Sequence, residues 1–245
     1  MDAPNGRDFY DQHGVFERYM NHRSWVENPN ETIEKPVVLA LLNARLEGPV
    51  LDLGCGFGDL AGEVLRRGAD GYTGIDSSRK MIALAQTQGL PPEAVFIRAD
   101  IHEWTYPEGR YHTVLARLVF HYTADLEGLL RNIHSSLRAG GELICSVEHP
   151  LLTSSFGVFR PEGKKGHWEV DRYFYSGSRL QDWLGGQVVK YHRTLEDYWQ
   201  LFMTAGFTIE VLKEGKPERS AFRSEEEFER RNRIPLFLIL KAVKR

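Results

Sequence analysis

The sequence of 245 residues predicts an α/β fold with a mostly parallel sheet and helices on both of its faces. First, a strand pattern, a glycine-rich turn and a helix pattern follow one another over residues 50–67. Second, strand and helix patterns alternate from there to residue 147, the order typical of parallel strands joined by helices. Third, a chain of this length can bury one large core, so we expect a single domain over residues 1–245.

Apolar spacing and turn residues predict the elements of the first part of the chain. Residues 33–46 have helical spacing and end before Gly48-Pro49, and a second helix is expected over residues 60–67. Gly140-Gly141 is expected to end the helix before the fifth strand. The five parallel strands are expected at residues 50–53, 71–75, 94–98, 112–117 and 142–147.

Regular structure resumes near residue 194. Thr194-Leu195-Glu196-Asp197 has the pattern of a capping box and starts a helix that runs to Ala205, before Gly206. Another helix is expected to start at Ser224. The two remaining strands are expected at residues 207–212 and 236–243.

Composition argues against several classes of protein. The net charge of −3 and the pI near 6.3 provide no field that attracts nucleic acid, so we expect no nucleic-acid partner. No apolar run reaches the ~18 residues of a membrane span, and residues 1–10 lack a signal-peptide core, so we expect a cytoplasmic protein with no membrane partner. Cys55 and Cys145 are too few for a disulfide framework or a cysteine-rich zinc site, and we expect no metal.

Acidic residues around the glycine-rich turn favour one type of ligand. Gly54 and Gly56 match the dinucleotide-binding pattern, but Asp59 stands at its third glycine position and would repel a pyrophosphate there. Asp52, at the end of the preceding strand, suits a ligand with a positive charge or N–H donors. Asp76 closes the next strand and can accept two hydrogen bonds from a ribose diol.

Four motifs then occur in a fixed order: LDLGCGFG at 51–58, GIDSS at 74–78, RADIHEW at 98–104 and LRAGGELICSVEHP at 137–150. In this order they resemble the class I S-adenosylmethionine (SAM)-dependent methyltransferases, in particular small-molecule methyltransferases of the ubiquinone and menaquinone biosynthesis type. The resemblance implies a Rossmann-like sheet of seven strands, whose last strand inserts antiparallel between the fifth and the sixth. It also implies SAM as the cofactor and S-adenosylhomocysteine (SAH) as the product.

The resemblance further implies a set of cofactor-binding residues. The turn from Gly54 to Gly56 would lie against the amino-acid part of SAM, with Asp52 near its ammonium group. Asp76 would bind the ribose hydroxyls. The expected set is Tyr19, Arg23, Asp52, Gly54, Cys55, Gly56, Asp76, Ser77, Met81, Ala99, Asp100, Ile101 and Arg117.

Some members of this set have a second interpretation. Asp100 would accept from the adenine amino group, but it is alternatively a loop or helix-cap carboxylate. Met81 and Ile101 would pack on the adenine faces, although Met81 has the spacing of a core residue. Arg23, which with Tyr10 and Tyr19 would close over SAM from the N-terminal segment, would pair with the SAM carboxylate unless it is a surface arginine.

Two segments around this domain have their own composition. Residues 1–48 begin polar and aromatic and are expected to form an N-terminal helical cover on the core. Residues 150–193 have no helical period and accumulate aromatic side chains, which argues against disorder. Because ligands of open α/β sheets bind at the strand ends where this insertion starts, we expect it to act as a lid over the methyl acceptor.

Methyl transfer from a sulfonium is an in-line displacement, for which a protein mainly supplies positioning. A general base is needed only if the acceptor atom must lose a proton. His121 and His149 are the expected catalytic candidates, with Glu148 and His192 as further ones, and each histidine is alternatively a hydrogen-bonded structural residue. The aromatic residues suit a planar or apolar acceptor, or equally a cation held by π faces.

The leading hypothesis is a methyltransferase that acts on a small-molecule acceptor. A tRNA or protein methyltransferase is the second, although Ala116-Arg117-Leu118-Val119 lacks the Asn/Asp-Pro-Pro-aromatic signature of many nucleic-acid amino methylases. The third is a SAM-fold binding module or an enzyme of a different reaction, because a cofactor site can survive the loss of transfer.

Overall fold

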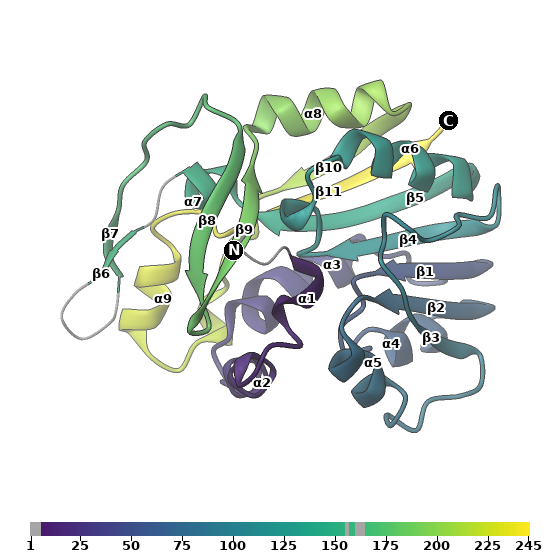
Figure 1. Cartoon of the computed structure of the whole chain (residues 1–245), viewed down its shortest axis with the longest axis horizontal. Helices are drawn as coiled ribbons and strands as arrows, with labels where there is room; N and C mark the ends of the chain where they lie inside the picture. The colour runs from purple at the N-terminus through teal and green to yellow at the C-terminus, as the bar shows by residue number, and fades with distance from the viewer. Residues whose placement is uncertain (1–5, 155–156, 160–164) are drawn as a thin grey trace.

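The computed structural model describes residues 6–154, 157–159 and 165–245. Its centre is a sheet of seven strands in the order β10-β11-β5-β4-β1-β2-β3 (Figure 1). Neighbouring strands pair in parallel from β3 to β5, whereas β11 is antiparallel to both β5 and β10. The fold expected from the sequence is therefore confirmed, including the antiparallel insertion of the last strand. The strands are β1 (Pro49–Leu53), β2 (Gly71–Asp76), β3 (Ala94–Arg98), β4 (Tyr111–Arg117), β5 (Leu137–Glu148), β10 (Phe207–Lys213) and β11 (Phe237–Lys244).

Helices cover both faces of the sheet, because successive side chains of a strand point to opposite sides (Figure 1). Leu51 and Leu53 of β1 join one buried cluster with Leu129 and Phe202 of the helices on one face. Val50, which precedes Leu51 and points to the opposite side, belongs to the cluster on the other face. The helices are α6 (Leu126–Ser136) and α8 (Leu195–Thr204) on the first face, and α3 (Lys35–Leu41), α4 (Ala61–Arg66) and α5 (Arg79–Ala85) on the second.

The helix predicted over residues 33–46 starts earlier and ends earlier. A single π-helical turn, η1 (Asn30–Glu34), continues directly into α3 (Lys35–Leu41). Leu42 is extended, with φ −68° and ψ 134°, so the apolar spacing continues beyond the helix that it predicted. The carbonyl of Leu42 accepts a hydrogen bond from the Arg67 guanidinium at 2.9 Å, which satisfies one acceptor at the helix end.

The fifth strand is longer than predicted, because Gly140-Gly141 does not end a helix. Helix α6 already ends at Ser136, and β5 starts at the next residue. Tyr111 of β4 pairs with Leu137, but Thr113 pairs with Glu142, so the intervening part of β5 loops out of the ladder. Gly140 has φ 74°, a conformation that this outward loop requires.

The aromatic stretch after β5 contains regular structure that its composition did not predict. Leu184 and Gly185, with φ 49° and 72°, form the two-residue turn of a hairpin, which fits the backbone of a type I′ turn. Positions 155–156 and 160–164, Phe156 among them, lie outside the described residues. The elements here are α7 (Pro150–Ser154), β6 (Gly157–Phe159), β7 (Lys165–Trp168), β8 (Gly177–Trp183) and β9 (Gly186–His192).

The β8–β9 hairpin and the N-terminal helices lie side by side (Figure 1). Phe9, Val15 and Val188 form a third buried cluster that joins them, separate from the two clusters of the sheet. No helix within the described ranges has the length and apolar character to cross a bilayer. The remaining elements are α1 (Gly6–Phe9), α2 (Val15–Arg23), η2 (Phe120–Tyr122), η3 (Arg219–Ala221) and α9 (Glu225–Arg231).

Candidate functional site

A cavity of about 350 Å³ lies at the carboxyl ends of the parallel strands. Its walls come from the ends of β1 to β5, from α1 and α2, and from the β8–β9 hairpin. All thirteen residues of the expected cofactor set line it, together with Tyr10, His121 and Glu148. The cavity thus brings together side chains from Tyr10 to Phe237, because the strand ends of a parallel sheet meet at one edge.

The glycine-rich turn has the backbone that its sequence requires. Gly54 and Gly56 have φ 65° and 54°, which L side chains rarely adopt. A Cβ on Gly54 would lie 2.3 Å from Cγ2 of Val119, whereas a Cβ on Gly56 would meet nothing within 4 Å. The amide of Cys55 donates to the carbonyl of Ile75 at 3.0 Å and attaches the turn to β2.

The two glycines therefore differ in the expected cost of a methyl group. Gly54→Ala is expected to lower the free energy of unfolding by about 1–3 kcal/mol, because it adds a steric overlap to the strained backbone. Gly56→Ala has the same kind of backbone strain without the overlap, so about 1 kcal/mol is expected. Urea unfolding measures both, and equal losses would contradict the role of Val119.

Two carboxyl groups flank this turn, the buried one of Asp52 and the half-buried one of Asp76. The Asp76 carboxylate accepts hydrogen bonds from the amides of Gly56, at 3.0 Å, and Ser78, at 2.8 Å. Burial raises the pKa of Asp76 to about 6 despite these two donors. Asp52 accepts from the Tyr72 hydroxyl at 2.6 Å, and burial raises its pKa to about 7. A ligand that brings hydrogen-bond donors or positive charge would therefore stabilise the ionised form of both groups.

A third acid, Asp100, lies two residues after the end of β3. Its Oδ1 accepts from the amide of His102 at 2.7 Å, which is the loop-carboxylate arrangement expected as the alternative. Asp100, Ala99 and Ile101 nevertheless all line the cavity, and so does the buried side chain of Met81. Asp100 therefore forms a loop hydrogen bond and lines the cavity at the same time.

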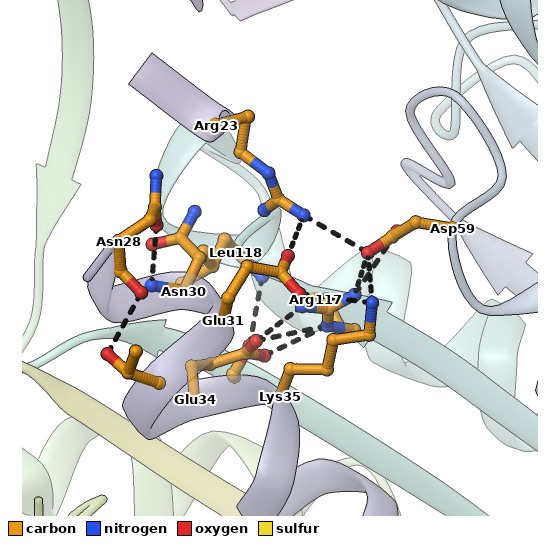
Figure 2. A network of polar contacts seen from close by, with 11 residues as sticks. Arg23, Asn28, Asn30, Glu31, Glu34, Lys35, Asp59, Arg117 and Leu118 are labelled. Carbon is orange, nitrogen blue, oxygen red and sulfur yellow. Dashed lines mark hydrogen bonds and ion pairs between the residues drawn. The ribbon is translucent and has the colours of Figure 1, made fainter. Parts of the chain in front are cut away.

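Six charged side chains form a network beside the turn (Figure 2). Arg23, Lys35 and Arg117 all bind Asp59. Burial acts to raise the pKa of Asp59, but these three cations outweigh it and lower that pKa to about 2. Arg117 also binds Glu34, while Arg23 and Lys35 bind Glu31. Arg23, which was expected to pair with the SAM carboxylate, is thus already paired with two carboxylates of the protein.

The N-terminal segment is attached to the site at a second point. Asp11 accepts hydrogen bonds from the Ser78 hydroxyl at 2.6 Å and from the amides of Arg79 and Lys80 at 2.9 and 3.1 Å. These amides belong to the first turn of α5, where a carboxylate is stabilised by the helix dipole. The Asp11 carboxylate therefore connects the segment before α2 to the turn that follows Asp76.

The histidines expected as catalytic candidates differ in position. His121 lines the cavity, and its Nδ1 accepts from the Glu148 amide at 3.3 Å, so the ring proton resides on Nε2. Burial lowers the pKa of His121 to about 3, a poor value for a base at neutral pH. His149 is not among the cavity residues and pairs with Glu214 at 3.2 Å, and His192 binds Thr153. The geometry does not favour a histidine base.

Two basic residues beside the cavity, Lys190 and Arg193, were not singled out from the sequence. Lys190 is buried, and its ammonium group lies over the rings of Tyr122 and Trp183, which line the cavity. Arg193 donates to the carbonyls of Thr123 and Ala124, at 2.6 and 2.9 Å, and fixes the loop after η2. In the sequence, Val188, Lys190 and His192 stand at every second position, which places them on one side of a half-buried strand. This alternation was the signal that could have indicated a buried Lys190.

Comparison with known proteins identifies the family. Residues 50–141 match the family described as methyltransferase domain. A Listeria monocytogenes protein of known structure, assigned as an S-adenosylmethionine-dependent methyltransferase, is 32% identical and superimposes with a TM-score of 0.79 over 86% of this chain and 96% of its own. The chain belongs to the SAM-dependent methyltransferases. The predicted family, enzyme class and cofactor are confirmed by these matches.

Two curated relatives are also similar. An uncharacterised Haemophilus influenzae protein is 31% identical over 222 residues, which are 84% of this chain and 85% of its own. A trans-aconitate 2-methyltransferase of Yersinia pseudotuberculosis is 30% identical over 138 residues, 55% of this chain and 52% of that protein. This second match spans about half of the relative.

Proposed function

We propose that this methyltransferase transfers the methyl group of SAM to a small-molecule acceptor inside the cavity. The observation that carries the proposal is the continuity of one cavity, about 350 Å³, from the glycine-rich turn to the aromatic side chains of the hairpin. This volume lies in the range of ~300–1,000 Å³ typical of small-molecule sites. The N-terminal helices and the hairpin wall the cavity on the side away from the sheet, which disfavours a macromolecular acceptor.

The residues present suit SAM in its expected position. The space within 4 Å of the point where a Cβ on Gly56 would lie is open, so the backbone can approach a ligand there. Asp76 would accept the ribose hydroxyls, and Asp52 would face the ammonium group. Met81 and Ile101 would pack on adenine beside Asp100. When bound, SAM supplies an electrophilic methyl group, and the protein positions the acceptor in line with it.

The ribose assignment is testable by calorimetry. Asp76→Asn is expected to weaken SAM and SAH binding by ~1.5–3 kcal/mol, roughly 10- to 100-fold, because the charged acceptor of the ribose hydroxyls is lost. The isosteric amide keeps an oxygen for the Gly56 and Ser78 amides. Asp70→Asn, at an exposed aspartate before β2, is the matched control and should leave binding unchanged.

Two outcomes would contradict the proposal at different levels. An unchanged affinity of the Asp76→Asn variant would remove the ribose role of this residue. Salt-dependent RNA binding by the wild-type protein would instead favour a tRNA acceptor. SAM binding without SAH production from any metabolite pool would favour a binding module.

A further inference from the structure

The aromatic end of the cavity is compatible, from its sequence, with either a cationic or a planar acceptor. Its aromatic side chains come from the N-terminal segment, η2 and the hairpin. They are Tyr10, Tyr19, Tyr122, Trp183 and Tyr191. Cation–π binding requires that a ligand cation reach a ring face. The neighbours of these rings therefore decide between the two kinds of acceptor.

An ammonium group of the protein itself already lies over two of these rings. Nζ of Lys190 lies 5.6 Å from the ring centre of Tyr122 and 5.3 Å from that of Trp183. Lys190 is 2% exposed, and its ammonium also forms an ion pair with the Glu148 carboxylate. The ring faces that Lys190 covers are therefore not open to a ligand cation.

The groups that face the acceptor are donors rather than bases. His121 presents a protonated Nε2, because its Nδ1 is used by the Glu148 amide. The hydroxyls of Tyr10 and Tyr122 lie 3.2 Å apart, so one of them donates its proton to the other. The proton of the second hydroxyl is then left to donate to a ligand. Burial raises the pKa of both tyrosines, so neither hydroxyl ionises near neutral pH.

We propose that the acceptor is a small unsaturated or aromatic carboxylic acid, methylated on its carboxylate oxygen. This inference rests on the proposed methyltransferase function and specifies its substrate class. A carboxylate oxygen carries no proton at neutral pH, so the reaction needs no base. That oxygen attacks the methyl carbon, the carbon–sulfur bond breaks with its electron pair left on sulfur, and the products are a methyl ester and SAH. Proton donors from His121 and the tyrosine pair bind the acid, and the aromatic walls contact its planar part.

The experiment combines substrate and ligand panels on the purified full-length protein. Benzoate, cinnamate and trans-aconitate are each compared with the corresponding amide, and benzylamine and phenol are added as acceptors of other classes. SAH binding is measured first by calorimetry, because its absence would contradict the methyltransferase function itself. With SAH bound, we expect at least one acid to bind ten-fold more tightly than its amide. With SAM, we expect that acid to gain one methyl group that mild alkali removes.

Specific results would overturn the inference while leaving the function intact. SAH production with the amine or phenol but with no acid would assign a different acceptor class. An alkali-stable methyl group would exclude an ester. Equal binding of acids and amides to the SAH complex, or binding of neither, would also contradict it.

Variants of the buried ion pair test the argument independently. Lys190→Met with Glu148→Gln removes both charges together, so that no buried charge is left unpaired. This double variant is expected to retain SAH binding and to bind benzylamine at least ten-fold more tightly than the wild type, because the rings are now open to a cation. Lys190→Arg, which keeps a cation over the rings, should exclude the amine as the wild type does. Amine binding that is unchanged in the double variant would contradict the proposed role of Lys190.

Discussion

Arg117→Met is expected to lower the free energy of unfolding by about 3–5 kcal/mol, because it leaves a buried carboxylate without its counter-ion. Nε and Nη2 of Arg117 contact the two oxygens of Glu34 at 3.1 and 2.6 Å, and the Glu34 side chain is 0% exposed. Nη1 contacts Asp59 at 3.2 Å. The Ser146 hydroxyl adds only one neutral donor to Glu34, at 2.5 Å. Figure 2 shows Arg117 between the two acids, and within the described part of the chain Arg117 is the cation paired with Glu34.

Arg131→Met is the matched control for this loss. Arg131 is 61% exposed and pairs with Glu127 one turn away on α6, an interaction worth about 0.3–0.5 kcal/mol. Urea unfolding curves measure both variants. Adding Glu34→Gln to Arg117→Met should recover a large part of the loss, since the unpaired charge is then removed. A loss no greater than that of Arg131→Met would mean that the network does not stabilise the fold.

The same contacts explain how the N-terminal segment is held beside the cavity at the carboxyl ends of the strands. Glu34 belongs to η1 and Arg23 to α2, whereas Arg117 ends β4 and Asp59 follows the glycine-rich turn. Neutralisation within this group allows six charges to lie together at the cavity wall. Because Arg23 and Arg117 are used in these pairs, we infer that their contribution to SAM binding is mainly the position of Asp59 and of the turn.

Local spacing explains how much of this site the sequence could predict. Asp52, the glycines and Asp76 lie within one strand-turn-helix-strand unit, whose geometry depends on near neighbours. Once the parallel order of the strands was predicted, their carboxyl ends had to meet at one edge. The expected cofactor residues therefore line a single cavity.

Long-range pairing and burial account for what could not be predicted. Glu34 and Arg117 are 83 residues apart, and Glu148 and Lys190 are 42 apart, so neither pair has a local pattern. The expected base role of His121 depended on an ordinary pKa, whereas burial lowers it to about 3. Burial of one side chain is a property of the whole fold. The sequence alone therefore indicated that His121 lies at the cavity, but not its protonation state.

Asp52→Asn is expected to stabilise the protein in the absence of ligand at pH 8, in contrast to most substitutions of buried residues. Burial raises the pKa of Asp52 from 3.8 to about 7, so the folded protein disfavours the ionised form. At about 1.4 kcal/mol per pKa unit, this difference sets an upper limit of about 4 kcal/mol, and about 2 kcal/mol is expected after relaxation. The amide oxygen can still accept from the Tyr72 hydroxyl at the 2.6 Å contact.

The pH dependence of this gain identifies its cause. Between pH 4 and pH 7 the folded wild type holds a proton on Asp52 that the unfolded chain has lost, so its stability falls as the pH rises. The gain of the variant is therefore complete above about pH 7 and shrinks as the pH falls toward 4. Urea unfolding at pH 5 and pH 8 measures it, with exposed Asp70→Asn as the control. A gain independent of pH, or a loss at pH 8, would contradict a buried charge at Asp52. If the gain occurs together with weaker SAM binding, the wild type tolerates an unfavourable carboxylate because its ligand needs one.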